Sequence, residues 1–171
     1  MNSFESFVAP VNDLGDRDPL SDWRWLVGED AEPVLLTAMG DMFVRRVSTG
    51  AILFVDALEG SISEAADSYD AWKVRLTEPE KFERWFLPAL VLLLRERGLV
   101  LADGQCYSPI HPLVLGGELV AENIETTSWR VHFCIAGQIH RQTKNLPPGT
   151  KISKIIIDDE EPPPKRWWKL W

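Results

Sequence analysis

Two cysteines and three histidines are the side chains best suited to chemistry in this sequence. The strongest nucleophile candidate is Cys106, which lies in the motif Gly104-Gln105-Cys106-Tyr107. A thiol becomes a nucleophile when a neighbouring histidine removes its proton, as in cysteine hydrolases. A buried thiol without chemistry explains the same residue, because cysteine is among the residue types most often found inside proteins. A cysteine-dependent hydrolase is therefore one hypothesis. Its histidine would be His111, His132 or His140.

The same side chains, together with Cys134, carry donor atoms that bind zinc. They form no pair at the usual ligand spacing, so the sequence predicts no metal site. The chain also lacks a glycine-rich phosphate loop, a paired-histidine metal helix and a serine nucleophile elbow. Its carboxylates are scattered without a recognisable pair of general acid and base. We therefore expect no enzymatic activity and no cofactor.

Acidic residues outnumber basic ones by 26 to 18, which gives a net charge of −8. The excess is concentrated in residues 1–40, which hold eight acids and two bases. A chain that binds nucleic acid directly shows a basic stripe for the phosphates, and this sequence has none. The acidic segment either solubilises the protein or forms an electrostatic face for a basic protein partner. The candidate partner-binding acids are Asp13, Asp16, Asp18, Asp22, Glu29, Asp30 and Glu32.

The C-terminal tail is a second candidate for partner binding. Residues 158–164 are acidic and rich in proline, which is typical of an extended linker. The tail that follows contains three tryptophans, Trp167, Trp168 and Trp171. Tryptophan is a frequent hot-spot residue at protein interfaces. The tail therefore folds back on its own domain, docks on another protein or contacts a membrane, which its short length and the negative net charge disfavour. Docking would make a regulatory or scaffold subunit an alternative function.

Hydrophobic patterning predicts a single α+β domain. Three short runs rich in β-branched and aromatic residues, 41–47, 51–57 and 61–66, are joined by turns that contain glycine, which indicates an antiparallel β-meander. A helix is predicted after Ser68, and a long helix from about 77 to 97 with a bend near Pro88. Its apolar residues surround most of the helix, so we expect it to be buried at the centre of the fold.

The last part of the chain allows two interpretations. A helix over 129–145 is favoured, but residues 130–135 also alternate like a strand. Strands are further expected at 118–125 and 151–157, and a short helix from Ser21. The predicted organisation is an acidic N-terminal segment (1–40), an α+β domain (41–157) and an acidic, proline-rich linker with a Trp-rich tail (158–171). In the domain, the meander packs against the long buried helix and a second, C-terminal helix.

Nothing in the sequence directs the chain into or across a membrane. Its apolar runs are far shorter than the roughly 20 residues that a membrane helix needs, and its acidic N-terminus is unlike a signal peptide. With two cysteines and no export signal, the reducing cytoplasm is the expected location.

Four motifs give the chain a family resemblance over roughly residues 40–152. They are Gly40-Asp41-Met42-Phe43, Asp67-Ser68-Tyr69, Gly104-Gln105-Cys106-Tyr107 followed by Pro112-Leu113-Val114-Leu115-Gly116-Gly117, and Leu146-Pro147-Pro148-Gly149-Thr150-Lys151-Ile152. In this order and spacing they resemble the C-terminal domain of the immunity proteins that neutralise DNase effectors of bacterial type VI secretion, a family formerly classed as a domain of unknown function. The meander is also similar, more distantly, to SUKH-like immunity domains.

This resemblance implies an antitoxin-like immunity protein that binds and neutralises a toxin in interbacterial competition and catalyses no reaction. The cognate toxin is expected to be a nuclease, whose basic surface an acidic inhibitor can occupy. The motif positions are implied to be structural; they are Gly104, Gln105, Cys106, Tyr107, Gly116 and Gly117.

Overall fold

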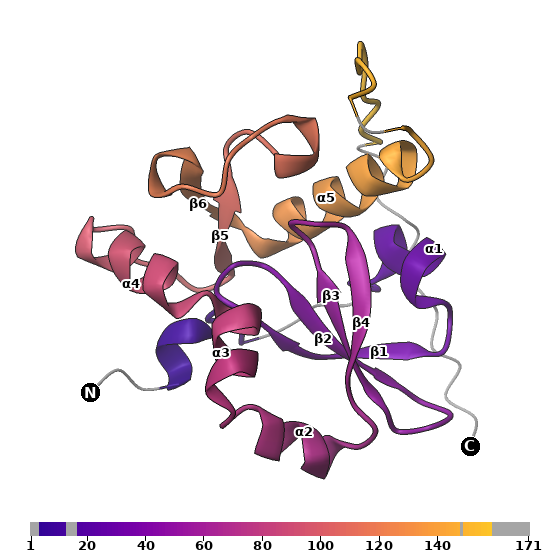
Figure 1. The fold of residues 1–171 in the computed structure, drawn as a ribbon, viewed down its shortest axis with the longest axis vertical. Helices are drawn as coiled ribbons and strands as arrows, with labels where there is room; N and C mark the ends of the chain where they lie inside the picture. Colours follow the sequence, from indigo (N-terminus) through magenta and orange to yellow (C-terminus); the bar gives the residue numbers. More distant parts are fainter. Residues whose placement is uncertain (1–3, 13–16, 148, 159–171) are drawn as a thin grey trace.

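A four-stranded antiparallel sheet lies at the centre of the computed structural model, which describes residues 4–12, 17–147 and 149–158. Its strands follow one another in the order β1 (Ala31–Leu36), β2 (Met42–Arg46), β3 (Ile52–Asp56) and β4 (Ser61–Ala66), as Figure 1 shows. The predicted meander is therefore confirmed as β2 to β4. Strand β1, which comes from the acidic N-terminal segment, pairs with β2 and was not predicted.

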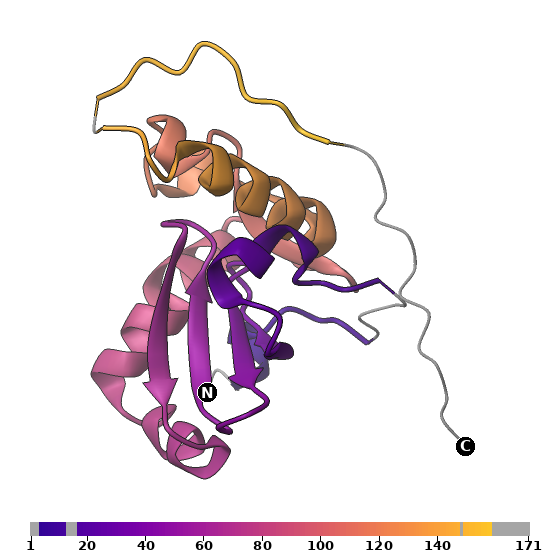
Figure 2. The same ribbon diagram turned by 90° about the vertical axis from the view of Figure 1, so that its right-hand side faces the viewer.

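Both faces of this sheet are buried because both sets of alternating side chains are apolar. Phe43 and Phe54 point into one hydrophobic cluster, whereas Met42, Val44 and Val55 point into the other. The first face is covered by α2 (Tyr69–Arg75), α3 (Pro79–Phe86) and α4 (Pro88–Glu96). The second is covered by α1 (Arg24–Val27), the turn before it, and α5 (Trp129–Thr143). Figure 2 shows α5 and the α2–α4 group on different sides of the sheet.

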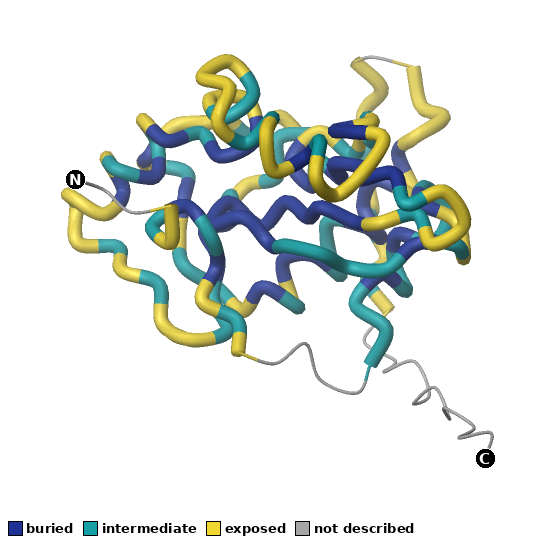
Figure 3. Tube along the Cα trace, turned by 90° about the horizontal axis from the view of Figure 1, so that it is seen from below, coloured by how far each residue is buried: buried dark blue, intermediate teal, exposed yellow. Residues whose placement is uncertain are grey.

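The predicted long helix is two helices that meet at Leu87. This residue has a left-handed conformation with φ of 45°, and Pro88 begins α4 directly after it. Proline is tolerated at the first position of a helix but lacks the N–H that would continue α3. Helix α4 buries Val91 and Leu94 but leaves Leu93 39% exposed. The expected central position of this helix is therefore wrong. The longest buried runs, 36–44 and 51–55, belong to β1, β2, β3 and the turns that join them. Figure 3 shows the buried segments in dark blue.

A second, two-stranded antiparallel sheet follows α4. It consists of β5 (Gln105–Pro109) and β6 (Ile124–Ser128). The strand expected at 118–125 is therefore wrong for residues 118–123 and overlaps β6 only at its last two residues. The helical interpretation of residues 129–145 is confirmed by α5, and the strand interpretation of 130–135 is wrong. Together these elements confirm the predicted α+β class. Single turns of 3-10 helix occur at Phe4–Phe7, Ser21–Trp23, Leu113–Leu115 and Ala121–Asn123.

Residues 149–158 form no strand, contrary to the prediction of an edge strand at 151–157. They run in an extended conformation over α5, which is visible in Figure 2. Two glutamines of α5 hold them by paired hydrogen bonds to the backbone. Gln142 binds the N–H and carbonyl of Ile156 at 3.1 and 2.8 Å, and Gln138 binds those of Asp158 at 2.8 and 3.2 Å. In the described part of the chain, no helix is long and apolar enough to cross a membrane.

Candidate functional site

The two-stranded sheet has one face in the core and one face that opens toward α5. Tyr107 and Ile124 point into the hydrophobic cluster beneath α4. Successive residues of a strand point to opposite faces, so Ser108 and its partner Glu125 point the other way. Helix α5 begins directly after β6, and the N–H of Trp129 donates to the carbonyl of Gly104 at the start of β5. The helix therefore lies across the open face of the small sheet.

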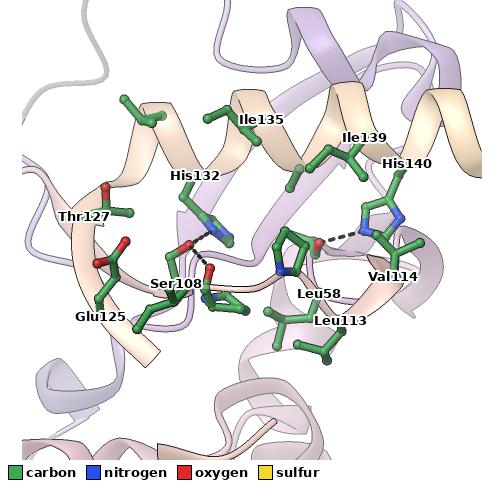
Figure 4. A pocket seen from close by; sticks show the side chains of 16 residues that line it. Leu58, Ser108, Leu113, Val114, Glu125, Thr127, His132, Ile135, Ile139 and His140 are labelled. Atoms are coloured by element: carbon green, nitrogen blue, oxygen red, sulfur yellow. Dashed lines mark hydrogen bonds between the residues drawn. The ribbon is translucent and has the colours of Figure 1, made fainter. Parts of the chain in front are cut away.

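The space between them is a cleft of about 210 Å³. Its apolar wall comes from three elements: α5, the loop that carries the Leu113–Leu115 turn, and the turn between β3 and β4. Figure 4 shows α5 along the top of the cleft, with Glu125 and Thr127 at one end and Leu113 and Val114 at the other. The polar side chains in the lining are Ser108, Glu125, Thr127, His132 and His140. No lysine or arginine of the described chain lines the cleft.

The two histidines of the cleft are neutral near pH 7. His132 places its Nδ1 atom 2.8 Å from the hydroxyl of Ser108, and its Nε2 atom is buried without a hydrogen-bond partner. Burial first, and then the proximity of His140, lower the pKa of His132 to about 4. His140 donates from Nε2 to the carbonyl of Ala57 at 3.1 Å, and burial lowers its pKa as well. Among the described residues that line the cleft, the carboxylate of Glu125 is therefore the only formal charge.

The structure brings Cys106 and His132 together, but not in a form that activates the thiol. Both lie against Gly40: a Cβ atom added there would be 2.5 Å from Nε2 of His132 and 3.1 Å from Sγ of Cys106. Cys106 is fully buried, and burial and the nearby Asp41 carboxyl both raise the pKa of its thiol. The pKa of Asp41 is itself raised well above its usual value, by burial and by Asp56. A protonated thiol and a neutral imidazole do not form the ion pair that a cysteine hydrolase needs.

A labelling experiment tests whether the thiol of Cys106 is inert. In a Cys134→Ser variant, which leaves Cys106 as the only cysteine, iodoacetamide should modify the native protein negligibly between pH 6 and 9, because the thiol is buried and protonated. The same variant unfolded in guanidinium chloride should react at the rate of a free thiol, as followed by mass spectrometry. Labelling of the native variant at or above the unfolded rate would revive the hydrolase hypothesis.

The remaining chemistry candidates are dispersed. His111 lies in the loop after β5, where its Nε2 atom is 2.9 Å from the carbonyl of Leu115, away from Cys106. Among the residues that the structure describes, no three histidine, cysteine or acidic side chains are arranged to hold a metal ion. Cys134 lies on α5, where its sulfur accepts a hydrogen bond from Gln138. The structure brings some of the zinc donors considered from the sequence close together, but the described ones do not form a three-ligand site.

The candidate partner-binding acids are partly engaged within the chain. Asp18 pairs with Arg24 at 2.9 Å, Glu32 pairs with Arg45, and Asp30 accepts hydrogen bonds from Ser48. Glu29 is 81% exposed, and Asp22 lies in the turn beside α5. Asp13, Asp16, Trp167, Trp168 and Trp171 lie outside the described residues. The partner-binding role of both groups stays a prediction.

The family-motif residues surround the small sheet. Gly104 directly precedes β5, and Gln105, Cys106 and Tyr107 are its first three residues. The hydroxyl of Tyr107 donates to the carbonyl of Leu99 at 2.7 Å. Gln105 accepts from the N–H of Ala102, and Gly116 and Gly117 end the turn that forms one wall of the cleft. Sequence reasoning did not identify Ser108, Glu125 or Val131 as cleft residues. The residues next to them in the sequence do not indicate that they line a cleft, because the cleft forms from segments that meet only in the folded chain.

Comparisons with known proteins support the resemblance drawn from these motifs. Residues 66–140, less than half of the chain, match the family described as T6SS immunity protein Tdi1, C-terminal, which supports the suspected family. The match contains every cleft-lining residue except Ala57 and Leu58. A structure titled "Crystal structure of Atu4351 from Agrobacterium tumefaciens" shares the fold with a TM-score of 0.52 at 20% sequence identity. The likeness covers 69% of this chain and 62% of that one. No curated protein matches the sequence.

Proposed function

We propose that this chain, whose residues 66–140 match the C-terminal family of the type VI secretion immunity protein Tdi1, binds and neutralises a toxin in the bacterial cytoplasm. The family match is the observation that carries the proposal. The toxin is a nuclease in this proposal, and the chain inhibits it by binding alone. In this proposal the chain inhibits the toxin through complementary surfaces and forms no covalent bond with it.

Charge supports a nuclease as the partner. A nuclease binds the phosphate backbone of its substrate with a basic surface. The chain has an excess of acids over bases, 26 to 18, and can present carboxylates to such a surface. Opposite potentials speed the encounter of two proteins and suppress wrong partners. A complex of this kind should therefore form faster at low ionic strength.

The state of Cys106 supports inhibition without catalysis. Its thiol is fully buried and its pKa is raised, so the best nucleophile candidate of the sequence is neither accessible nor ionised. The cleft beside it holds two neutral histidines, each bonded through one ring nitrogen to a group of the chain itself: His132 to the hydroxyl of Ser108, and His140 to the carbonyl of Ala57. Contacts of this kind are typical of a rigid binding surface that is already formed before the partner binds.

The experiment uses the product of the neighbouring toxin gene, with its nuclease site inactivated for purification. The two proteins should co-purify at 50 mM salt, and the association rate constant should fall at least about tenfold between 50 and 500 mM salt. Co-expression with the active toxin should restore growth of the host cells. A chain that neither protects the cells nor binds the inactive toxin at low salt contradicts the proposed function.

A further inference from the structure

We infer that the cleft beneath α5 is the anchor site of the toxin complex and receives an arginine side chain of the toxin. This inference rests on the proposed function, because the arginine belongs to the basic surface of the bound nuclease. It is carried by three features of the cleft: its volume, its apolar walls and the position of its single charge.

The volume fits one long side chain. At about 210 Å³ the cleft is smaller than the roughly 300–1,000 Å³ of sites that hold drug-sized ligands or cofactors. It is several times larger than the roughly 30 Å³ that one water molecule occupies in the liquid. An anchor residue at a protein interface fills a pocket of this kind, and arginine is among the residues most enriched in such anchors.

The walls fit the aliphatic part of that side chain. Val131, Ile135 and Ile139, spaced four residues apart on α5, line the cleft. Figure 4 shows Ile135 and Ile139 on α5, with Leu58 and Leu113 on the opposite side of the cleft. At the rim, Val131 is 49% exposed and Ile110 is 59% exposed, so apolar surface continues out of the cleft onto the protein surface. Long cationic side chains bury their methylene groups against such surface and keep the charged group at a polar end.

The single charge fits the guanidinium. Glu125 is exposed and lies at one end of the cleft, and the hydroxyl of Ser108, its partner in the strand pair, lies beside it. The histidines add no positive charge near pH 7, and no lysine or arginine of the described chain lines the cleft to compete for this carboxylate. A planar guanidinium pairs with a carboxylate through two parallel N–H donors, a geometry that lysine cannot offer.

The first test uses a small probe and no toxin. N-acetylarginine methylamide is titrated into the full chain, and the methyl NMR signals of Val131, Ile135 and Ile139 are followed. We expect saturable shifts with a Kd of about 1–10 mM, in the range of ligands held by one side-chain contact. The citrulline analogue, which is nearly isosteric but uncharged, should bind at least about fivefold more weakly. Glu125→Gln should weaken the arginine probe by a similar factor.

Matched variants separate the cleft from the surface in general. Glu118→Gln removes an exposed carboxylate outside the cleft and should leave binding of the probe unchanged. Against the toxin, Val131→Arg places a guanidinium at the cleft and should weaken the complex by about 30-fold or more, as expected for a hot spot. Val74→Arg introduces the same side chain at a 66% exposed valine of α2 and should change the affinity less than about twofold.

Each alternative occupant of the cleft predicts a different experimental result. If the arginine and citrulline probes bound equally well, the cleft would be assigned to an uncharged group and the inference would be overturned. The same conclusion would follow if Glu125→Gln bound the arginine probe as tightly as the unmodified chain does. A shift of the same methyl signals on deletion of residues 159–171 would assign it to the chain's own tail and also overturn it. A toxin complex that Val131→Arg leaves intact refutes the inference alone, whereas the absence of any complex with the unmodified chain refutes the proposed function.

Discussion

Replacing Gly40 by alanine is expected to lower the free energy of unfolding by about 3 kcal/mol or more, as the sum of backbone strain and overpacking. Gly40 has φ of 83°, a left-handed conformation that costs other residues roughly 1–2 kcal/mol. The added Cβ atom would also lie 2.5 Å from Nε2 of His132, which is closer than real Cβ atoms approach a neighbour. His132 cannot move aside freely, because its ring is buried and bonded to Ser108. Urea denaturation measures the change.

Gly50 provides the matched control for this variant. It has φ of 79°, but a Cβ atom added there meets nothing within 4 Å. Gly50→Ala should therefore cost only the backbone strain of about 1–2 kcal/mol. In a double-mutant cycle, His132→Ala should remove most of the extra cost of Gly40→Ala, because the two side chains would compete for one space. Equal destabilisation by Gly40→Ala and Gly50→Ala would show that the close approach of His132 has no energetic effect.

Replacing Trp23 by alanine is expected to destabilise the fold by about 3–5 kcal/mol, the usual cost of removing a buried large aromatic side chain. Trp23 is fully buried between the sheet and α5, and its ring centroid is 5.1 Å from that of Phe133. Its Nε1 atom donates to the carbonyl of Phe133 at 2.8 Å. Truncation leaves a cavity and removes both this hydrogen bond and the ring contact with Phe133, so α5 is held less tightly to the N-terminal part of the chain.

Two further substitutions test the explanation. Trp23→Phe keeps an aromatic ring but removes the hydrogen bond, and should cost about 1–3 kcal/mol. Trp25→Ala removes a neighbouring, only half-buried tryptophan that stacks on Trp23 at 6.1 Å, and should cost less than Trp23→Ala. Thermal and urea unfolding measure all three variants. A Trp23→Ala protein as stable as the unmodified chain would mean that residues before β1 contribute little to the domain.

Local sequence signals were sufficient where neighbouring residues form the structure. The meander β2–β4 follows from runs of β-branched and aromatic residues and from glycines such as Gly50 at its turns. Ser68 caps α2, as predicted, by accepting from the N–H of Ala71. The break at Leu87 was anticipated as a bend, because Pro88 was visible in the sequence, but the bend is complete enough to make two helices.

Local sequence signals did not predict the structure of segments whose hydrogen-bonding partner is distant in the chain. Strand β5 was not predicted, because Gln105–Pro109 becomes a strand only by pairing with β6, about twenty residues later. Residues 151–157 have the composition of a strand, yet the backbone of Ile156 is bound by Gln142 of α5 instead of by a neighbouring strand. Gln138 binds the backbone of Asp158 in the same way. The composition of a segment indicates a preference for an extended conformation, but it does not specify which groups will form hydrogen bonds with its backbone.

The sequence by itself determined the α+β class, the acidic character, the family resemblance and the absence of familiar catalytic motifs, since each of these depends on residue types and local spacing. Only the tertiary structure decided that Cys106 is buried beside Asp41 and that Ser108, Glu125 and α5 enclose a cleft. Burial, pKa and cavity shape depend on which distant segments exclude water from a given atom. That exclusion is a property of the packed chain, and no local pattern of residues encodes it.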